Sequence, residues 1–149
     1  MRNLRDRLGR ELLILDGAMG TMLQSRGLAL GELPERMNLT APAVVREVHA
    51  AYLAAGADIL ETNTFGANRL KYGNDLASVV SSGVRAAREA IADSGRDAYV
   101  AASIGPLGKL LKPMGDLPFE GAYSLFREIA ACALNAGADA LLFETFTDL

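Results

Sequence analysis

Short runs of apolar residues recur along the chain, each ends in a polar residue, and longer amphipathic stretches separate them. Continuous apolar runs of this kind are typical of buried parallel strands, whose polar groups emerge at the carboxyl end. We therefore expect four strands, at residues 11–16 (ELLILD), 58–62 (DILET), 98–103 (AYVAAS) and 139–144 (DALLFE).

The stretches between these runs predict helices at residues 42–55, 74–94 and 119–135, because apolar side chains recur there at i, i+3/i+4 and i+7. A glycine closes each of these stretches, as is common at helix ends. Thr40 is the expected N-cap of the first helix, and Pro42 lies in its first turn. Residues 21–26 predict only a helical turn before a long loop.

Strands that alternate with helices through right-handed crossovers give a parallel sheet with helices outside it. Residues 55–65 (AGADILETNTF) also align without gaps on residues 136–146 (AGADALLFETF), two strand–helix units later. Repetition at this scale favours an α/β fold of the (β/α)-barrel type. A doubly wound sheet is the alternative, although the sequence lacks its G-x-G-x-x-G fingerprint.

Candidate chemistry lies at the strand ends, where a (β/α) barrel places its active site. Asp16 ends the first run and is followed by Gly17, Ala18, Met19 and Gly20. A carboxylate beside accessible backbone N–H groups can hold an amino group and an anion. A simple βα turn in which Asp16 caps local amides explains the same pattern equally well.

A second acid, Glu144, closes the fourth run. A carboxylate after buried apolar residues is costly unless it is paired or used. Asp16 and Glu144 are therefore expected on one rim of the barrel, where two acids suit general acid–base chemistry or binding of a cationic amino group.

The other two strand ends are also polar or rich in glycine. Residues 61–68 (ETNTFGAN) carry five hydrogen-bonding side chains, more than a turn needs, which favours a function. Residues 103–118 form a long loop rich in Gly and Pro, of a kind that is usually functional or mobile. Its lysines, Lys109 and Lys112, are expected to be solvated.

Composition narrows the class of protein. With 50% hydrophobic and 22% charged residues and a net charge of −3, the chain is neither collagen-like, coiled-coil nor disordered, and its 149 residues suggest one domain. No basic run exceeds a pair and no stretch of 18 apolar residues occurs, so neither nucleic acid nor a membrane is an expected partner. The single cysteine, Cys132, excludes an internal disulfide and fits a reducing, cytoplasmic location.

Two residues that often bind metals are expected to be structural here. Cys132 lies near the apolar stripe of a predicted helix, where cysteine is usually a small buried hydrophobe. The only histidine, His49, is expected to be partly exposed or to pack between helices, far from the strand ends. Zinc needs three or four ligands, so these residues do not build a metal site.

Four blocks, in order and spacing, resemble the start of the homocysteine S-methyltransferase family. They are residues 15–27 (LDGAMGTMLQSRG), 38–73, 103–111 (SIGPLGKLL) and 137–149 (GADALLFETFTDL). They are most similar to the homocysteine module of cobalamin-dependent methionine synthase, and closer still to bacterial proteins that join this module to a methylenetetrahydrofolate reductase.

The resemblance implies a (β/α)8 TIM-type barrel that transfers a methyl group to the zinc-bound thiolate of homocysteine and so makes methionine. By position, the homocysteine-binding residues are Asp16, Gly17, Ala18, Thr64 and Glu144. The implied partners are homocysteine and a methyl donor, and the implied cofactors are zinc and, through other domains, cobalamin or folate.

Residues 1–149 match only four βα units, the N-terminal half of such a barrel. Cys132 matches none of the family's zinc-binding cysteines, which are expected beyond Leu149. The chain by itself is therefore expected to be an incomplete and inactive domain. Two alternatives stay open: a half-barrel assembly module that pairs its exposed edges with another chain, and a metal-independent barrel enzyme that uses Asp16 and Glu144.

Overall fold

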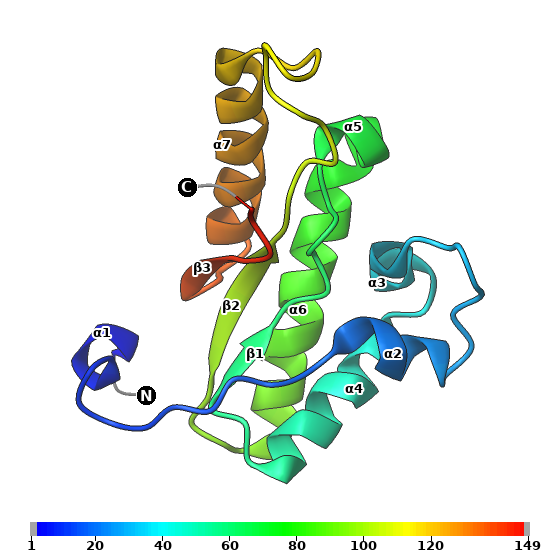
Figure 1. The fold of residues 1–149 in the computed structure, drawn as a ribbon. Coiled ribbons are helices and arrows are strands. Elements are labelled where there is room, and N and C mark those ends of the chain that lie inside the picture. Colours follow the sequence, from blue (N-terminus) through cyan, green and yellow to red (C-terminus); the bar gives the residue numbers. More distant parts are fainter. Residues whose placement is uncertain (1–2, 148–149) are drawn as a thin grey trace.

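The computed structural model describes residues 3–147 of the chain, and its elements alternate as the sequence pattern predicts (Figure 1). The strands are β1 (Ile59–Glu61), β2 (Tyr99–Ile104) and β3 (Ala140–Phe143). The α-helices are α1 (Leu4–Arg7), α2 (Met19–Gln24), α3 (Met37–Thr40), α4 (Pro42–Ala55), α5 (Arg69–Tyr72), α6 (Leu76–Ser94) and α7 (Phe119–Asn135). Two 3-10 turns, η1 (Pro34–Arg36) and η2 (Gly73–Asp75), precede α3 and α6.

The three long helices confirm the prediction from apolar spacing. α4 and α7 have the predicted bounds, and α6 begins two residues later than predicted because η2 takes up the start of that segment. Gly56 ends α4 in the left-handed region, with φ of 109°. The prediction of Thr40 as N-cap of α4 is wrong: Ala41 holds that position, and the Thr40 hydroxyl donates to the Arg36 carbonyl instead.

The sheet is parallel, in the order β1-β2-β3. Residues 11–16, predicted as a strand, are instead an extended segment that runs beside β1 with a single bridge, Leu15 to Ile59. On either side of that bridge, a backbone N–H group donates to an aspartate side chain instead of to a backbone carbonyl. The Ile14 N–H donates to the Asp58 side chain at 3.1 Å, and the Glu61 N–H donates to the Asp16 side chain at 2.9 Å. A longer backbone ladder therefore does not form between these segments.

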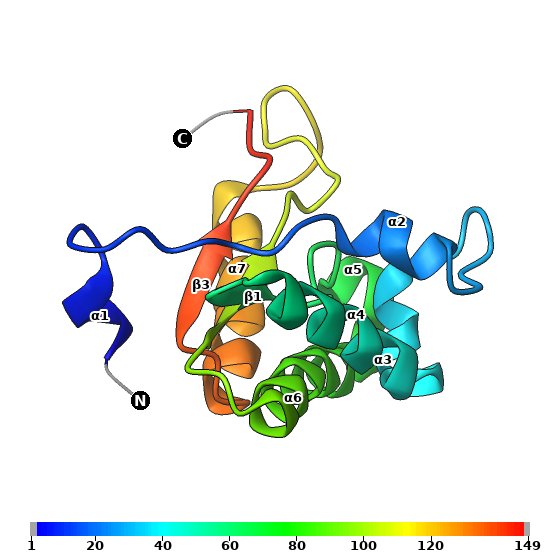
Figure 2. The same ribbon diagram turned by 90° about the horizontal axis from the view of Figure 1, so that it is seen from below.

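The two faces of the sheet follow the alternation of strand side chains. Leu60, Val100 and Ala102 point to the face that the long helices cover, and they lie in its apolar clusters. Ile59 and Tyr99 point to the opposite face, where Leu4 of α1 packs on them. Figure 2 shows α4, α6 and α7 on one side of the sheet and the segment that leads to α2 crossing the other side.

The internal repeat is a structural repeat as well. Gly56 and Gly137 both take left-handed backbone conformations, with φ of 109° and 96°. Two residues later, each copy places an aspartate whose carboxylate accepts a backbone N–H from the preceding strand segment. Asp58 accepts from Ile14 at 3.1 Å, and Asp139 accepts from Val100 at 2.8 Å. The repeated motif therefore ends a helix and ties the next strand to its neighbour.

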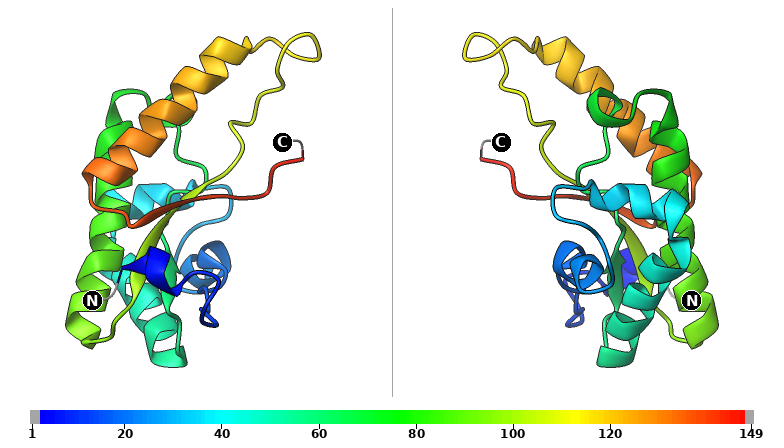
Figure 3. Two further views of the ribbon diagram at one scale, coloured as in Figure 1. Left: turned by 90° about the vertical axis from the view of Figure 1, so that its left-hand side faces the viewer. Right: turned by 90° about the vertical axis from the view of Figure 1, so that its right-hand side faces the viewer.

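The carboxyl ends of the strands open into the loops that form the rim. The segment after β3 and the long loop at residues 105–118 project to one side, away from α6 (Figure 3). The loop leads into α7, and Phe146 after β3 packs on Phe126 of α7. Lys109 and Lys112 in this loop are exposed, as predicted. Within the described part of the chain, no helix is both long enough and apolar enough to cross a bilayer.

Candidate functional site

A cavity of about 380 Å³ lies at the carboxyl ends of the strands, within the size range of small-molecule pockets. It collects residues from the turn after residue 15, the loop before α3, and the ends of all three strands. The lining residues are Asp16, Gly17, Ala18, Met19, Gly20, Pro34, Glu35, Glu61, Thr62, Asn63, Phe65, Ser103 and Glu144. Both predicted rim acids, Asp16 and Glu144, thus lie on the same cavity.

Asp16 is held by the backbone of the neighbouring strand. Its N–H donates to the Ile59 carbonyl at 3.0 Å, and its Oδ1 atom accepts from the Glu61 N–H at 2.9 Å. The side chain is only 1% exposed, although the residue lines the cavity. A carboxylate in this setting has a fixed orientation, because one of its oxygens is tied to β1.

The turn formed by Gly17 and Ala18 lies against Tyr52 of α4. The Tyr52 hydroxyl donates to the Ala18 carbonyl at 3.1 Å, and a Cβ on Gly17 would come within 3.0 Å of the same hydroxyl. Glycine at this position therefore lets the turn approach α4. Burial, followed by the charge of Asp16, raises the pKa of Tyr52.

Two further carboxylates of the cavity, Glu61 and Glu144, come from strand ends. Glu144, after β3, accepts a hydrogen bond from the hydroxyl of Ser103. Burial, and then the charges of Glu144 and Asp16, raise the pKa of Glu61 to about 7. Near pH 7 Glu61 is therefore about half protonated, and a cationic ligand group in the cavity would favour its ionised form. Glu61 was not singled out from the sequence, although its place at the end of a buried strand was a usable signal.

Thr64 lies beneath the rim and is not among the residues that line the cavity. It is 1% exposed, and its hydroxyl donates to the Ser103 carbonyl at 2.7 Å. Because that hydroxyl has a single hydrogen, the 2.6 Å contact with Thr62 Oγ1 uses the Thr62 hydrogen. These bonds tie the end of β1 to β2, so Thr64 supports the site from behind.

Most polar side chains of residues 61–68 hold the loop in place. The Asn63 side chain donates to the Pro34 carbonyl and to the Asn38 side chain, both at 2.9 Å. Asn68 caps α5 by accepting from the Lys71 N–H at 3.1 Å. The polar density that suggested a function in the sequence is thus explained in large part by loop structure, although Glu61, Thr62 and Asn63 also line the cavity.

The position of His49 corrects the sequence-based expectation. Its side chain is fully buried, and its Nδ1 atom lies 3.9 Å from Asp16 Oδ2, directly behind a strand end. Of the two settings expected from the sequence, partial exposure is wrong and burial against neighbouring elements is what the structure shows. The expectation that His49 lies far from the predicted strand ends is also wrong, because Asp16 ends the first predicted strand. His49 lies four residues after Val45 and four before Leu53, so all three share the buried face of α4. This spacing was the signal available in the sequence.

Zinc, which the family resemblance implies, does not fit the residues on this rim. Within residues 3–147, no three His, Cys, Asp or Glu side chains cluster in a way that could hold a metal ion. Cys132 is half-buried on α7 against the apolar cluster shared with α6, and burial raises the pKa of its thiol. It is a packing residue, as predicted.

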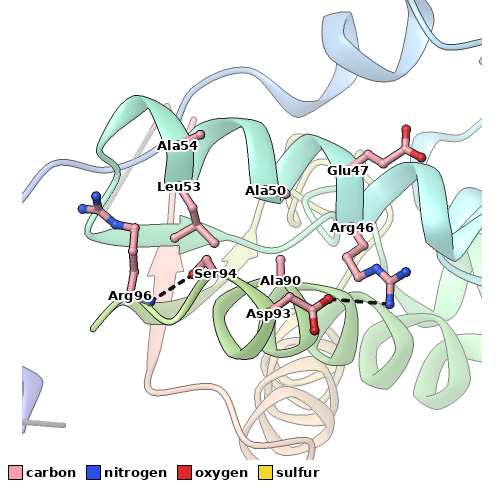
Figure 4. Close-up of a pocket in the computed structure, with 9 residues that line it drawn as sticks. All are labelled: Arg46, Glu47, Ala50, Leu53, Ala54, Ala90, Asp93, Ser94 and Arg96. Atoms are coloured by element: carbon pink, nitrogen blue, oxygen red, sulfur yellow. Dashed lines mark hydrogen bonds and ion pairs between the residues drawn. The ribbon is translucent and has the colours of Figure 1, made fainter.

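A second hollow, of about 450 Å³, lies between α4 and α6 (Figure 4). Arg46 pairs with Asp93 across it at 3.9 Å, and the Arg96 N–H donates to Ser94 Oγ at 3.1 Å. Arg46 and Asp93 thus pair on the helix surfaces, and no strand-end residue lines this hollow. The rim cavity is therefore the better candidate for chemistry.

Comparison with known proteins is consistent with this geometry. The sequence profile described as "Homocysteine S-methyltransferase" matches residues 13–149. The chain belongs to the homocysteine S-methyltransferase family. This confirms the resemblance noted from the sequence blocks, and the match includes every strand end that lines the cavity.

Among curated relatives, the chain is 35% identical over 161 residues to the methionine synthase of Mycobacterium tuberculosis (strain ATCC 25618 / H37Rv). It is 34% identical over 161 residues to the methionine synthase of Mycobacterium leprae (strain TN). Each alignment covers 99% of this chain but 13% of the relative. The chain thus spans a small part of the length of these relatives.

Among solved structures, the homocysteine methyltransferase MmuM from Escherichia coli has a similar fold. Its metallated form superposes with a TM-score of 0.80 at 27% identity, covering 96% of this chain and 57% of MmuM. Its apo form gives a TM-score of 0.70 at 30% identity, covering 94% of this chain and 51% of MmuM. The α/β fold with a parallel sheet is therefore shared with part of MmuM.

Proposed function

We propose that residues 1–149 supply the amino-acid end of the homocysteine-binding site in a homocysteine S-methyltransferase. In this proposal Asp16 and Glu144 accept hydrogen bonds from the ammonium group of homocysteine. The observation that carries it is the convergence of Asp16, Glu61 and Glu144 on one cavity, in a chain that belongs to this family. An ammonium group has three donors and no acceptor, so it is matched by several carboxylate oxygens.

The surrounding residues orient these acids. Glu61 contributes its backbone N–H to Asp16, and Ser103 contributes its hydroxyl to Glu144. Gly17 and Ala18 bring the backbone of their turn to the same cavity. Thr64 serves the site by joining the β1 end to β2, which sets the distance between the acids.

The proposed reaction is methyl transfer from an activated donor to the sulfur of homocysteine, giving methionine. A sulfur–methyl bond forms, the bond between the methyl group and the donor breaks, and the thiol proton is lost. In such chemistry zinc would act as a Lewis acid that stabilises the thiolate. Because residues 3–147 do not fit zinc, its ligands belong in this proposal to sequence outside residues 1–149, and the chain alone is inactive.

We further propose that the chain forms four βα units of a (β/α)8 barrel, with residues 11–16 in the place of the first strand. The parallel order of β1, β2 and β3, and the bridge from Leu15 to Ile59, support this arrangement. The coverage of 57% of MmuM by this chain is consistent with about half of such a domain. A cytoplasmic location stays a prediction that rests on the single cysteine.

The methyl donor is left open by these residues. Methylcobalamin, methyltetrahydrofolate acting through cobalamin, S-methylmethionine and betaine all fit a transfer to the homocysteine sulfur. The donor site, and any cobalamin or folate domain, lies in this proposal outside residues 1–149.

The experiment uses the full-length protein that contains this chain. Binding of homocysteine is compared with binding of 4-mercaptobutyrate, which is homocysteine without its amino group, by isothermal titration calorimetry. Asp16→Asn and Glu144→Gln are each expected to weaken homocysteine binding by roughly 30-fold or more, because each removes a buried partner of a charged group. Neither variant is expected to change binding of 4-mercaptobutyrate by more than about 3-fold.

Glu47→Gln is the matched control, since Glu47 is an exposed carboxylate on α4 that does not line the rim cavity. Conversion of homocysteine to methionine, followed by mass spectrometry, tests the reaction in the same protein. Unchanged homocysteine affinity in both rim variants, or no homocysteine binding by the wild type, contradicts the proposal.

One alternative, a half-barrel module that associates with another chain, has a specific observation in its favour. Apolar side chains are exposed at the rim and along the open edge of the sheet, including Leu12 at 87%, Met114 at 82% and Phe143 at 53%. Such a surface suits association with another chain. In the proposed barrel the same surface is covered by the remaining units of the domain.

A further inference from the structure

His49 is a polar side chain in an apolar part of α4. It is 0% exposed, and its helix neighbours on the inward face are Val45, Val48 and Leu53. Within residues 3–147, neither Nδ1 nor Nε2 of its ring has a hydrogen-bond partner. Burial of an imidazole without partners costs free energy that an apolar side chain of similar size does not. Packing alone therefore does not account for a histidine at this position.

His49 faces Asp16, whose side chain is 1% exposed. The Oδ1 atom of Asp16 is bonded to the Glu61 N–H, whereas Oδ2 has no partner among the described residues. The distance from His49 Nδ1 to Asp16 Oδ2 is 3.9 Å. Two buried and unpartnered polar atoms, one able to donate and one able only to accept, thus face each other about 1 Å beyond hydrogen-bond length.

We propose that His49 is a positioning residue for Asp16: its Nδ1–H group donates to Oδ2 and fixes the carboxylate while that carboxylate binds the ammonium group of the substrate. This inference rests on the proposed function, in which Asp16 accepts from the amino group of homocysteine. Catalytic hydrogen bonds that are long in a ligand-free structure commonly shorten in the complex. If the ring carries its single hydrogen on Nδ1, its N–H group has Asp16 Oδ2 as acceptor.

The proposal leaves Asp16 able to bind substrate. A carboxylate has about four acceptor positions, and the donors from Glu61 and His49 occupy one on each oxygen. One position on each oxygen remains for the ammonium group. The N–H donor of the ring orients the carboxylate and leaves its remaining lone pairs to a cation.

α4 contacts the same turn at a second point. Tyr52 follows His49 by three residues, so both project from one face of the helix. The Tyr52 hydroxyl donates to the Ala18 carbonyl at 3.1 Å, two residues beyond Asp16. α4 therefore supports the rim turn at its backbone through Tyr52 and at its carboxylate through His49.

The test compares three forms of the full-length protein: wild type, His49→Leu and His49→Asn. Leucine keeps an apolar side chain of comparable size, whereas asparagine keeps an N–H donor near the position of Nδ1. His49→Leu is expected to weaken homocysteine binding by roughly 10- to 100-fold, as for loss of a hydrogen bond to a charged group. His49→Asn is expected to stay within about 5-fold of the wild type. Neither variant should alter binding of 4-mercaptobutyrate, which has no amino group.

Val48→Ala is the matched control, because Val48 is the fully buried neighbour of His49 on α4. It is expected to lower the melting temperature and to leave the ratio of the two affinities unchanged. If His49→Leu weakens both ligands equally, or neither, the proposal is wrong and His49 only packs. If the wild-type protein binds no homocysteine, it is the proposed function that fails.

A second measurement does not depend on homocysteine. In the ¹⁵N spectrum of histidine-labelled protein, the His49 ring is assigned by its loss in His49→Leu. Asp16→Asn is expected to shift the Nδ1 resonance of that ring, because it replaces the charged acceptor opposite it. An unchanged Nδ1 resonance contradicts the pairing of His49 with Asp16, whatever the protein binds.

Discussion

The hydroxyl of Ser103, near the end of β2, donates a hydrogen bond to the carboxylate of Glu144, which follows β3. Ser103 is 2% exposed, so its hydroxyl is withdrawn from bulk water, whereas Glu144 is partly exposed. The bond links two neighbouring strand ends and determines where one rim acid points.

Ser103→Ala is therefore expected to weaken homocysteine binding by about 10-fold in the full-length protein, since it removes a hydrogen bond to a charged group. Calorimetric titration measures this change. Ser124→Ala is the control, because the Ser124 hydroxyl donates to the Glu120 carbonyl within α7 and is exposed. Equal affinities of Ser103→Ala and the wild type would show that Glu144 needs no support from β2.

Glu61 makes stability depend on pH in a defined direction. Its pKa is about 7 in the folded protein, against an ordinary value of 4.5. Between these two values the folded state holds a proton that the unfolded chain has released, so stability falls as the pH rises. Glu61→Gln cannot ionise. As the pH rises from 4.5 to 8, its free energy of unfolding is therefore expected to increase by about 1 kcal/mol relative to that of the wild type, after allowance for solvent screening.

Urea unfolding at the two pH values measures this gain, and Glu47→Gln on the exposed face of α4 is the control. The control is expected to show the same difference from the wild type at both pH values. The same result for Glu61→Gln would contradict the raised pKa of Glu61.

Gly83 lets α6 approach the loops that carry the rim. A Cβ at this position would lie 2.8 Å from the Asn38 side-chain nitrogen and 2.9 Å from Cγ2 of Thr64. Both neighbours are buried and hydrogen-bonded, so neither can move freely. Alanine is favoured over glycine by about 1 kcal/mol in a helix, but overpacking costs about 1–3 kcal/mol.

Gly83→Ala is therefore expected to lower the free energy of unfolding by about 1 kcal/mol, measured by urea unfolding. The matched change Gly20→Ala in α2 places its Cβ in open space and is expected to be neutral or stabilising. Stabilisation by Gly83→Ala would mean that Asn38 and Thr64 shift readily, against the buried hydrogen bonds described for them.

The open edge of the sheet predicts association of the isolated chain. β3 lies at the edge, and Phe143 at its end is 53% exposed while contacting Phe126 and Phe146. Residues 1–149 expressed alone are expected to form dimers or larger species in light scattering after size exclusion. Phe143→Lys is expected to lower the average mass.

Leu30→Lys is the control for that change, since Leu30 is 95% exposed but lies in the loop that follows α2. It is expected to leave the mass distribution as it is in the wild type. A monomer of constant mass over a wide concentration range would rule out edge pairing as the fate of the isolated chain.

Local spacing of residues along the chain was enough to predict several helices and strands. The apolar repeat placed α4 and α7 at their observed bounds, because each helix buries one continuous stripe. The strands at β1, β2 and β3 follow from buried apolar runs, and the Gly-Ala-Asp repeat gives the same helix end and strand tie twice. The family, too, was accessible from four blocks of sequence.

Which groups face each other depends on how distant segments pack, and local spacing does not reveal it. Residues 11–16 have a strand-like pattern, yet the Asp58 carboxylate takes the Ile14 N–H and limits pairing to one bridge. Periodicity could place His49 on a buried face but not opposite Asp16, since that distance depends on how α4 packs beneath a turn far away in the chain. The pKa of Glu61 is raised for the same reason: its burial and its acidic neighbours arise only when three separate segments meet.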